Sequence, residues 1–173
     1  MTTAGTVPAA IDRFDEFFAR ELRSLEAIAY GLTGRRALAE ELAQEAMLVV
    51  YRRWDALARY DDPAAFARRV VANKAVSVFR RLLAEGRALN RVRQRPKPPP
   101  TVLTEHDHAL WSAVRDLPRR QAQAVTLRYV DDLDTATIAS ILGCSEGAVR
   151  GTLHRARRAL ALALGRTDEE EDR

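Results

Sequence analysis

Hydrophobic residues recur along this chain at the three- and four-residue spacing of helices, and no useful stretch alternates apolar with polar residues as a strand would. A first apolar stripe covers residues 11–28 and is expected to end near Gly31. A second covers residues 38–54. A third helix is expected to start where Asp62 can cap it and Pro63 can occupy its first position. The pattern predicts an all-α fold.

The helical pattern stops between residues 84 and 104, where the sequence RPKPPP occurs. Proline cannot sit inside a helix, so this segment is expected to be an extended, semi-rigid spacer. Two more helices are expected after it, over residues 105–117 and 119–130, with a break at Pro118. We therefore predict two small helical domains (residues 11–83 and 105–165), a basic proline-rich linker between them (residues 84–104) and an acidic tail (residues 166–173).

The C-terminal domain has the pattern of a helix-turn-helix. Apolar residues at helical spacing lead to Gly143, which can supply the positive φ that follows many helices. Ser145 can then cap a second helix through its side-chain oxygen. The apolar stripe of that helix comprises Val149, Leu153, Ala156 and Leu160. The side chains off the stripe include Arg150, His154 and Arg157. A basic second helix of this kind is the element that enters the major groove, so the pattern suggests a protein that reads DNA.

Charge supports this interpretation only weakly. The chain of 173 residues has a net charge of +4, and of its 28 basic residues only Lys74 and Lys97 are lysines. Arginine forms bidentate hydrogen bonds to phosphate and to guanine, but a GC-rich genome would give the same bias. The basic linker fits either a polyanionic partner or a solvated tether.

Other kinds of chemistry find no support in the sequence. The single cysteine, Cys144, excludes an internal disulfide, and its spacing to the histidines matches no structural zinc site. No glycine-rich phosphate loop and no serine–histidine–acid arrangement occurs, so we expect no metal, no cofactor and no catalysis. There is no signal peptide and no apolar run approaching a membrane span, so a cytoplasmic protein without membrane contact is expected.

Three segments follow one another along the chain: AEELAQEAMLVVYRRW (residues 39–54), DPAAFARRVVANKAVSVFRR (residues 62–81) and residues 117–160, which contain SEGxV and LHRAR motifs. In this order they resemble the extracytoplasmic-function group of bacterial sigma factors, the promoter-recognition subunits of RNA polymerase. The first segment is similar to the family's core-binding helix, and the second is similar to the helix that captures the downstream promoter element. The third is similar to the reader of the upstream element.

The resemblance implies partners and site residues. The partners are the RNA polymerase core (clamp helices of the largest subunit and flap of the second), promoter DNA and, as for many such factors, an anti-sigma protein. Core-binding positions are Glu41, Leu42, Gln44, Glu45 and Leu48. Positions for the downstream element are Asp61, Asp62, Arg69, Asn73, Lys74, Arg80 and Arg81. Positions for the upstream element are Arg119, Arg120, Ser145, Glu146, Arg150, Gly151, His154, Arg155 and Arg157.

Two of these assignments have an alternative. Glu45 and its neighbours also fit a solvated helix face that pairs with nearby arginines. Asp62 is suited to accept hydrogen bonds from a base, in a loop over about residues 59–64, or to act only as a helix cap. The chain also departs from the family at Glu41 and Ser77, where aspartate is usual. For the whole protein, the alternative to a sigma factor is a stand-alone helix-turn-helix regulator.

Overall fold

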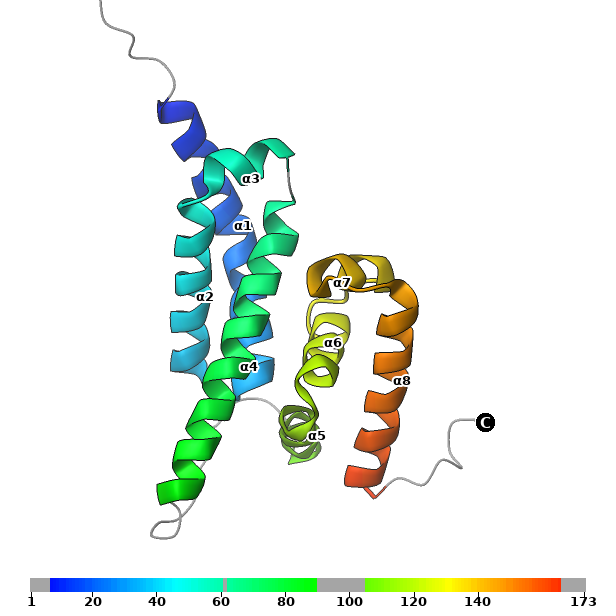
Figure 1. The fold of residues 1–173 in the computed structure, drawn as a ribbon. Helices are drawn as coiled ribbons and strands as arrows, with labels where there is room; N and C mark the ends of the chain where they lie inside the picture. The colour runs from blue at the N-terminus through cyan, green and yellow to red at the C-terminus, as the bar shows by residue number, and fades with distance from the viewer. Residues whose placement is uncertain (1–6, 61, 90–104, 166–173) are drawn as a thin grey trace, which may run out of the picture.

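The computed structural model describes residues 7–60, 62–89 and 105–165, and these residues form eight α-helices and no strand. The prediction of an all-α fold is confirmed. Figure 1 shows two groups of helices side by side. The first bundle contains α1 (Val7–Thr33), α2 (Arg36–Tyr51), α3 (Trp54–Tyr60) and α4 (Pro63–Leu89). The second bundle contains α5 (Glu105–Asp116), α6 (Arg119–Tyr129), α7 (Thr135–Leu142) and α8 (Glu146–Ala163).

The core of the first bundle lies between α1, α2 and α4, which all pack against one another. The apolar stripes supply its fully buried side chains, among them Leu25, Ile28, Met47 and Val71. Burying each such side chain stabilises the fold by about 1.5–3 kcal/mol relative to leaving it in water. The helices therefore form because their apolar faces close on one core.

Helix α1 continues past Gly31, where the sequence predicted its end. It ends at Thr33, and Gly34 takes the left-handed conformation with a φ of 66°. Gly31 instead lies within the helix, where it is buried against Thr126, Val130 and Trp111 of the second bundle. A larger residue at this position would crowd the second bundle, so a tertiary contact accounts for the glycine. Local rules for turns and helix ends do not predict such a contact.

The predicted second helix is divided in two. Helix α2 ends at Tyr51, and Trp54 begins the short helix α3. The Trp54 ring packs on Phe14 and Phe17, with ring centroids 5.3 and 5.2 Å apart, and this contact with α1 accompanies the change of direction. Because α3 extends to Tyr60, the loop expected over residues 59–64 is shorter than predicted.

Helix α4 begins as predicted and ends later. The Asp62 carboxylate accepts hydrogen bonds from the backbone N–H groups of Ala64 and Ala65, at 2.9 and 3.1 Å. The helix then continues through Gly86 to Leu89, into the segment expected to be linker. Glycine in a helix interior costs about 1 kcal/mol relative to alanine, which does not by itself end a helix.

The helix-turn-helix of the second bundle is confirmed in its details. Asp134 caps α7 through the Thr137 N–H at 2.7 Å, and Gly143 ends α7 with a φ of 64°. The Ser145 hydroxyl caps α8 by accepting from the Ala148 N–H at 3.2 Å. The predicted stripe of α8 is buried, at Val149, Leu153, Ala156 and Leu160. Among the described helices, none is both long enough and apolar enough to cross a membrane.

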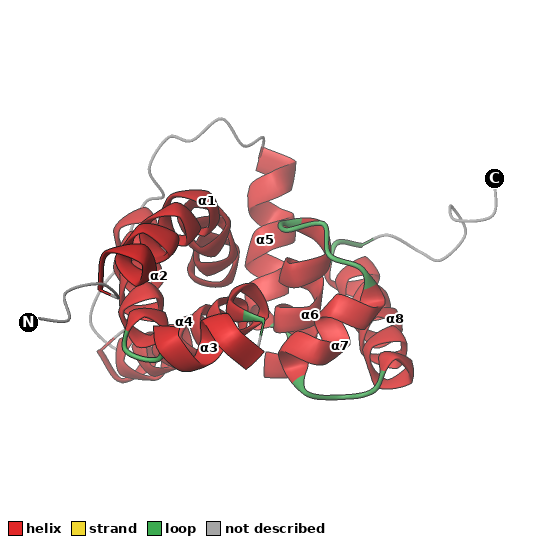
Figure 2. Ribbon diagram, turned by 90° about the horizontal axis from the view of Figure 1, so that it is seen from above, coloured by secondary structure: helices red, strands yellow, loops and turns green. Residues whose placement is uncertain are grey.

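The two bundles pack against each other. Helix α4 contacts α6 and α7, and α1 contacts α5 and α6. Figure 2 shows α2 on the side of the first bundle away from α7 and α8. We call this packing the closed arrangement, and no pattern in the sequence predicts it.

Candidate functional site

The outer face of α2 combines acidic and apolar side chains. Glu41 and Gln44 are exposed, and Leu48 is 56% exposed although it is apolar. Leu42 is only 3% exposed and packs in the core. The apolar stripe of the helix turns its side chain inward, so Leu42 is not part of the exposed face. The remaining face suits a partner surface that carries both basic and apolar groups.

Glu45 on the same helix already has a partner within the chain. Its carboxylate lies 2.6 Å from the Lys74 ammonium of α4, and both side chains are partly exposed. Glu40 likewise pairs with Arg36, at 2.9 Å, one turn earlier on α2. Such exposed pairs contribute little to stability, so these acids stay available to a stronger partner.

Two polar residues of α4 expected to face DNA are held by the second bundle. The Arg69 guanidinium donates from Nε to the Ile141 carbonyl and from Nη2 to the Ser140 carbonyl, each at 2.6 Å. The Asn73 side-chain oxygen accepts from Arg119 at 2.6 Å and from Gln123 at 2.9 Å. In the closed arrangement these groups are therefore engaged with α6 and α7.

The other positions expected for the downstream element are distributed along α4. Arg80 donates to the Leu117 carbonyl at 3.3 Å, and Arg81 lies 3.8 Å from Glu85. The side-chain oxygen of Asp62 caps the helix. Asp61 lies outside the described residues.

A cluster of ionised side chains joins the bundles near the start of α4. Arg68 donates to Asp131 at 2.6 Å and to Glu21 at 2.8 Å, and Ser24 also donates to Asp131. These charged side chains are only 10–13% exposed. Burial opposes the charge of Arg68, but the hydrogen bond and charge of Asp131, followed by those of Glu21, outweigh it and raise the Arg68 pKa above its ordinary value. Sequence reasoning missed Asp131, because no local signal pairs residues so distant in the chain.

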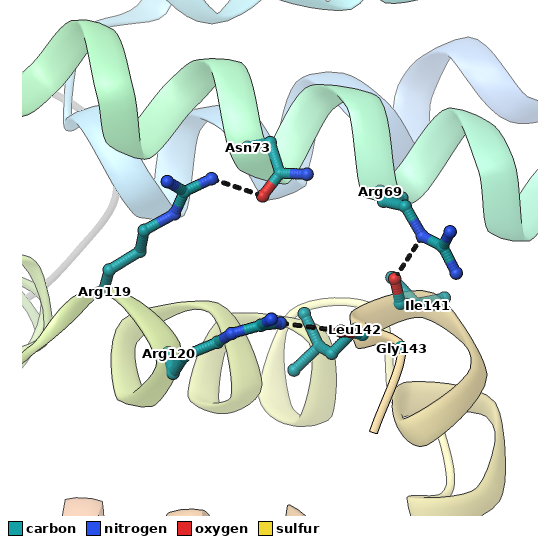
Figure 3. Close-up of a pocket in the computed structure, with 7 residues that line it drawn as sticks. All are labelled: Arg69, Asn73, Arg119, Arg120, Ile141, Leu142 and Gly143. Atoms are coloured by element: carbon teal, nitrogen blue, oxygen red, sulfur yellow. Dashed lines mark hydrogen bonds between the residues drawn. The ribbon is translucent and has the colours of Figure 1, made fainter.

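A pocket of about 360 Å³ lies between the bundles. Its lining comprises Arg69, Asn73, Arg119, Arg120, Ile141, Leu142 and Gly143. Figure 3 shows the arginines reaching the pocket from both sides, from α4 and from the start of α6. Arg120 donates to the Leu142 carbonyl at 2.7 Å. Arg69 and Arg120 thus bind carbonyl groups at the C-terminal end of α7, and Arg119 binds Asn73.

The exposed face of α8 gathers the remaining residues expected to read DNA. Glu146, Arg150, His154, Arg155 and Arg157 are all exposed. Arg150 lies 3.3 Å from Glu146 one turn away, and Arg157 donates to the Tyr129 hydroxyl at 3.1 Å. Gly151 leaves room beside Arg155, whose Nη1 lies 3.4 Å from where a Cβ would be. The predicted set for the upstream element thus separates into this α8 face and the Arg119–Arg120 pair at the pocket.

Comparison with known proteins identifies the family. The family model for sigma-70 region 2 matches residues 17–85, and that for sigma-70 region 4 matches residues 107–160. The RNA polymerase sigma-E factor of Streptomyces coelicolor is 33% identical over 123 residues, which are 68% of this chain and 67% of that protein. The chain belongs to the sigma-70 family of RNA polymerase sigma factors, in its extracytoplasmic-function group.

Two further relatives give the same result. The RNA polymerase sigma-E factor of Streptomyces avermitilis is 32% identical over 68% of this chain, and the match spans 66% of that protein. The ECF RNA polymerase sigma factor BldN of Streptomyces coelicolor is 32% identical over 78% of this chain, and the match spans 54% of it. The chain thus matches only about half to two thirds of the length of these relatives.

Solved structures of similar fold contain both bundles. The sigma factor RpoE of Bartonella quintana, solved in complex with the anti-sigma factor NepR, gives a TM-score of 0.69 at 21% identity. That match covers 93% of this chain and 99% of the other. CnrH, solved in complex with the cytosolic domain of CnrY, gives 0.64 at 21% identity, over 88% of this chain and 87% of the other.

Proposed function

We propose that this chain binds the RNA polymerase core and directs transcription initiation from specific promoters. The single observation that carries the proposal is the presence of the region 2 and region 4 folds in one chain, in that order. The region 2 bundle exposes a face with acidic and apolar groups on α2, and the region 4 bundle exposes a basic face on α8. The role requires no catalysis or cofactor from this chain and places it in the cytoplasm with the chromosome.

The α2 face is the proposed contact with the clamp helices of the largest polymerase subunit. Glu41, Gln44 and Glu45 would accept hydrogen bonds from basic side chains there. Leu48 would add apolar contact area. Hydrogen bonds between carboxylates and arginines are roughly twice as strong as neutral ones. The second bundle is proposed to meet the flap of the second subunit, and an anti-sigma protein is a further proposed partner.

The α8 face is the proposed reader of the upstream promoter element. Arg150 is exposed and carries the guanidinium that a bidentate contact to guanine requires, and Glu146 is suited to accept a hydrogen bond from cytosine. Arg155 and Arg157 lie farther along the exposed face, where contacts to phosphate would position the helix. The surface also includes the exposed side chain of His154 and Gly151, which has no side chain beside Arg155.

The downstream element is proposed to be captured along α4. Arg69, Lys74, Arg80 and Arg81 would hold the phosphates of the separating strands, while Asn73 would contact a base edge. Removing a base from the stack costs a few kcal/mol, which these contacts would offset. Because α6 and α7 hold Arg69 and Asn73 in the closed arrangement, the bundles must separate before α4 can bind a promoter.

Run-off transcription tests this function. Sigma-free core polymerase would transcribe a library of genomic fragments with and without the chain, and discrete start sites that appear only with the chain are expected. The double variant Glu41→Arg and Gln44→Arg should abolish these transcripts, because it reverses one charge and adds another positive charge on the α2 face. A matched reversal at the exposed Glu16 of α1 should leave them unchanged.

Two outcomes would contradict the proposal. Unchanged transcription by the α2 double variant would exclude that face as the docking surface. No new start sites from a folded chain that binds a DNA site tightly by itself would instead indicate a stand-alone regulator.

A further inference from the structure

The pocket between the bundles concentrates positive charge. Three of its seven lining residues are arginines, and none of the seven is acidic. Arg69 comes from the first bundle, whereas Arg119 and Arg120 come from the second. Figure 3 shows these side chains around one space, with Asn73 beside Arg119. Bringing three like charges together across an interface is unfavourable unless negative charge balances them.

The groups that now contact these arginines balance only part of the charge. Arg69 and Arg120 bind carbonyls at the C-terminal end of α7, and Arg119 binds the neutral amide of Asn73. A helix C-terminus carries the equivalent of roughly half a negative charge. Each guanidinium has five N–H donors, so donors remain beyond the one or two bonds that each arginine makes here.

The shape and chemistry of the pocket suit an oxyanion. Its volume of about 360 Å³ falls within the range of small-molecule sites. Guanidinium groups match phosphate oxygens in a bidentate geometry that lysine cannot provide. Arg119 and Arg120 also begin α6, and Pro118 before them provides no side-chain cap for the free N–H groups of the first turn.

We propose that this pocket binds a small anion with a phosphate chain, which bridges Arg69 of the first bundle to Arg119 and Arg120 of the second. The bound anion neutralises the converging charges and stabilises the closed arrangement. The regulatory consequence rests on the proposed function: Arg69 and Asn73 are also proposed contacts of the downstream promoter element, so the anion and the promoter compete for Arg69 and for the open state of the bundles.

Binding is measured on the full chain without polymerase or DNA. The probes are inorganic pyrophosphate, GTP and guanosine, in calorimetry and thermal unfolding at constant ionic strength set with sodium chloride. Pyrophosphate and GTP should both bind and raise the unfolding temperature, whereas guanosine should do neither. Binding of GTP but not pyrophosphate would show that the pocket recognises a nucleotide. Binding of both would show that it recognises the phosphate chain alone. Binding of neither would overturn the proposal.

Arg120 offers the sharpest variant, because its one described hydrogen bond stays within the second bundle. Arg120→Gln should weaken pyrophosphate binding about tenfold or more, and Arg120→Lys should restore part of it. The matched control is Arg158→Gln on the exposed face of α8, which should bind as the unaltered chain does. Equal binding by Arg120→Gln and Arg158→Gln would place the anion elsewhere on the basic surface.

Fluorescence energy transfer tests whether the anion bridges the bundles. A labelled variant would carry Cys144→Ser with Ala56→Cys on α3 and Leu162→Cys on α8, two exposed positions in different bundles. Pyrophosphate should raise the fraction of closed molecules and reduce binding of a short DNA duplex. Binding that leaves transfer unchanged or lowers it would overturn the bridging role. This assay needs no promoter activity, so its result stands apart from that of run-off transcription.

Discussion

At the scale of single residues, Arg68 is the side chain on which the contact between the bundles depends most. It is mostly buried and binds two acids from different bundles, Glu21 and Asp131. Removing one partner from a buried ion cluster leaves uncompensated charge, which typically costs about 3–5 kcal/mol. Arg68→Ala should therefore lower the urea midpoint strongly. Arg36→Ala, which breaks the exposed pair with Glu40, should lower the urea midpoint only slightly, and equal effects of the two substitutions would contradict this account.

Asp134 gives the chain a local dependence on pH. The hydrogen bond from the Thr137 N–H lowers the pKa of its carboxyl. The cap therefore contributes its full stability above the ordinary aspartate pKa of about 3.9 and loses it as pH falls through the lowered value. Thermal unfolding should show Asp134→Ala as less stable than the unaltered chain at neutral pH, with the difference shrinking in acid. Asp134→Asn, which keeps a capping oxygen but cannot titrate, should differ from Asp134→Ala by an amount that does not change with pH.

The sequence correctly predicted the roles of single residues where the interaction involves neighbours in the chain. Asp62, Gly143 and Ser145 act where the sequence predicted, because a cap or a left-handed turn depends on residues three or four positions away. Leu42 belongs to the core-binding motif, but its side chain is buried. A motif therefore does not by itself say which of its side chains lie on the surface. Asp131 could not be predicted, because its partner lies more than sixty positions earlier in the chain.

At the scale of elements, α8 can be tested as a reading helix. Arg150→Ala should relax base preference at one position of the upstream element, because a bidentate contact to guanine discriminates by about 1–3 kcal/mol. The measurement is transcription by the reconstituted holoenzyme from promoters altered one base at a time. The matched control is Arg158→Ala, which should retain the preference. Unchanged preference in Arg150→Ala would remove this residue from the reading set.

Helix boundaries show what periodicity can and cannot predict. The existence of α1, α2, α4 and the helix-turn-helix followed from apolar spacing, because each needs one buried face. The break before α3 did not follow, because Trp54 keeps the helical spacing while it packs on aromatic rings of α1. Tertiary contacts decided where these elements end.

At the scale of the whole molecule, the closed arrangement leaves polar atoms unsatisfied. Gln123 Oε1 and Thr126 Oγ1 are buried and have no hydrogen-bond partner in the described part of the chain. Both residues lie against the first bundle, Gln123 at Asn73 and Thr126 at Gly31. A buried polar atom without a partner costs about 1–3 kcal/mol. Rehydration of these atoms would therefore offset part of the cost of separating the bundles.

A substitution at Gly31 can separate the bundles without altering any residue that is proposed to contact polymerase, DNA or the anion. A Cβ at this position would lie 3.1 Å from the Thr126 side chain, so Gly31→Leu should force the second bundle away while favouring helix α1. Small-angle scattering should report a larger radius of gyration. Ala27→Leu, at an exposed position of the same helix, should leave it unchanged. An equally small radius in both variants would show that the packing absorbs the extra volume.

The position of α2 has a kinetic consequence. This helix lies on the side of the first bundle away from α7 and α8, so its outer face is open while the bundles are still together (Figure 2). Under the proposed function, polymerase can therefore capture the closed molecule and opening can follow as a separate, first-order event. In rapid mixing, the observed rate of opening should then rise with core concentration to a plateau set by the separation of the bundles, and not by the encounter.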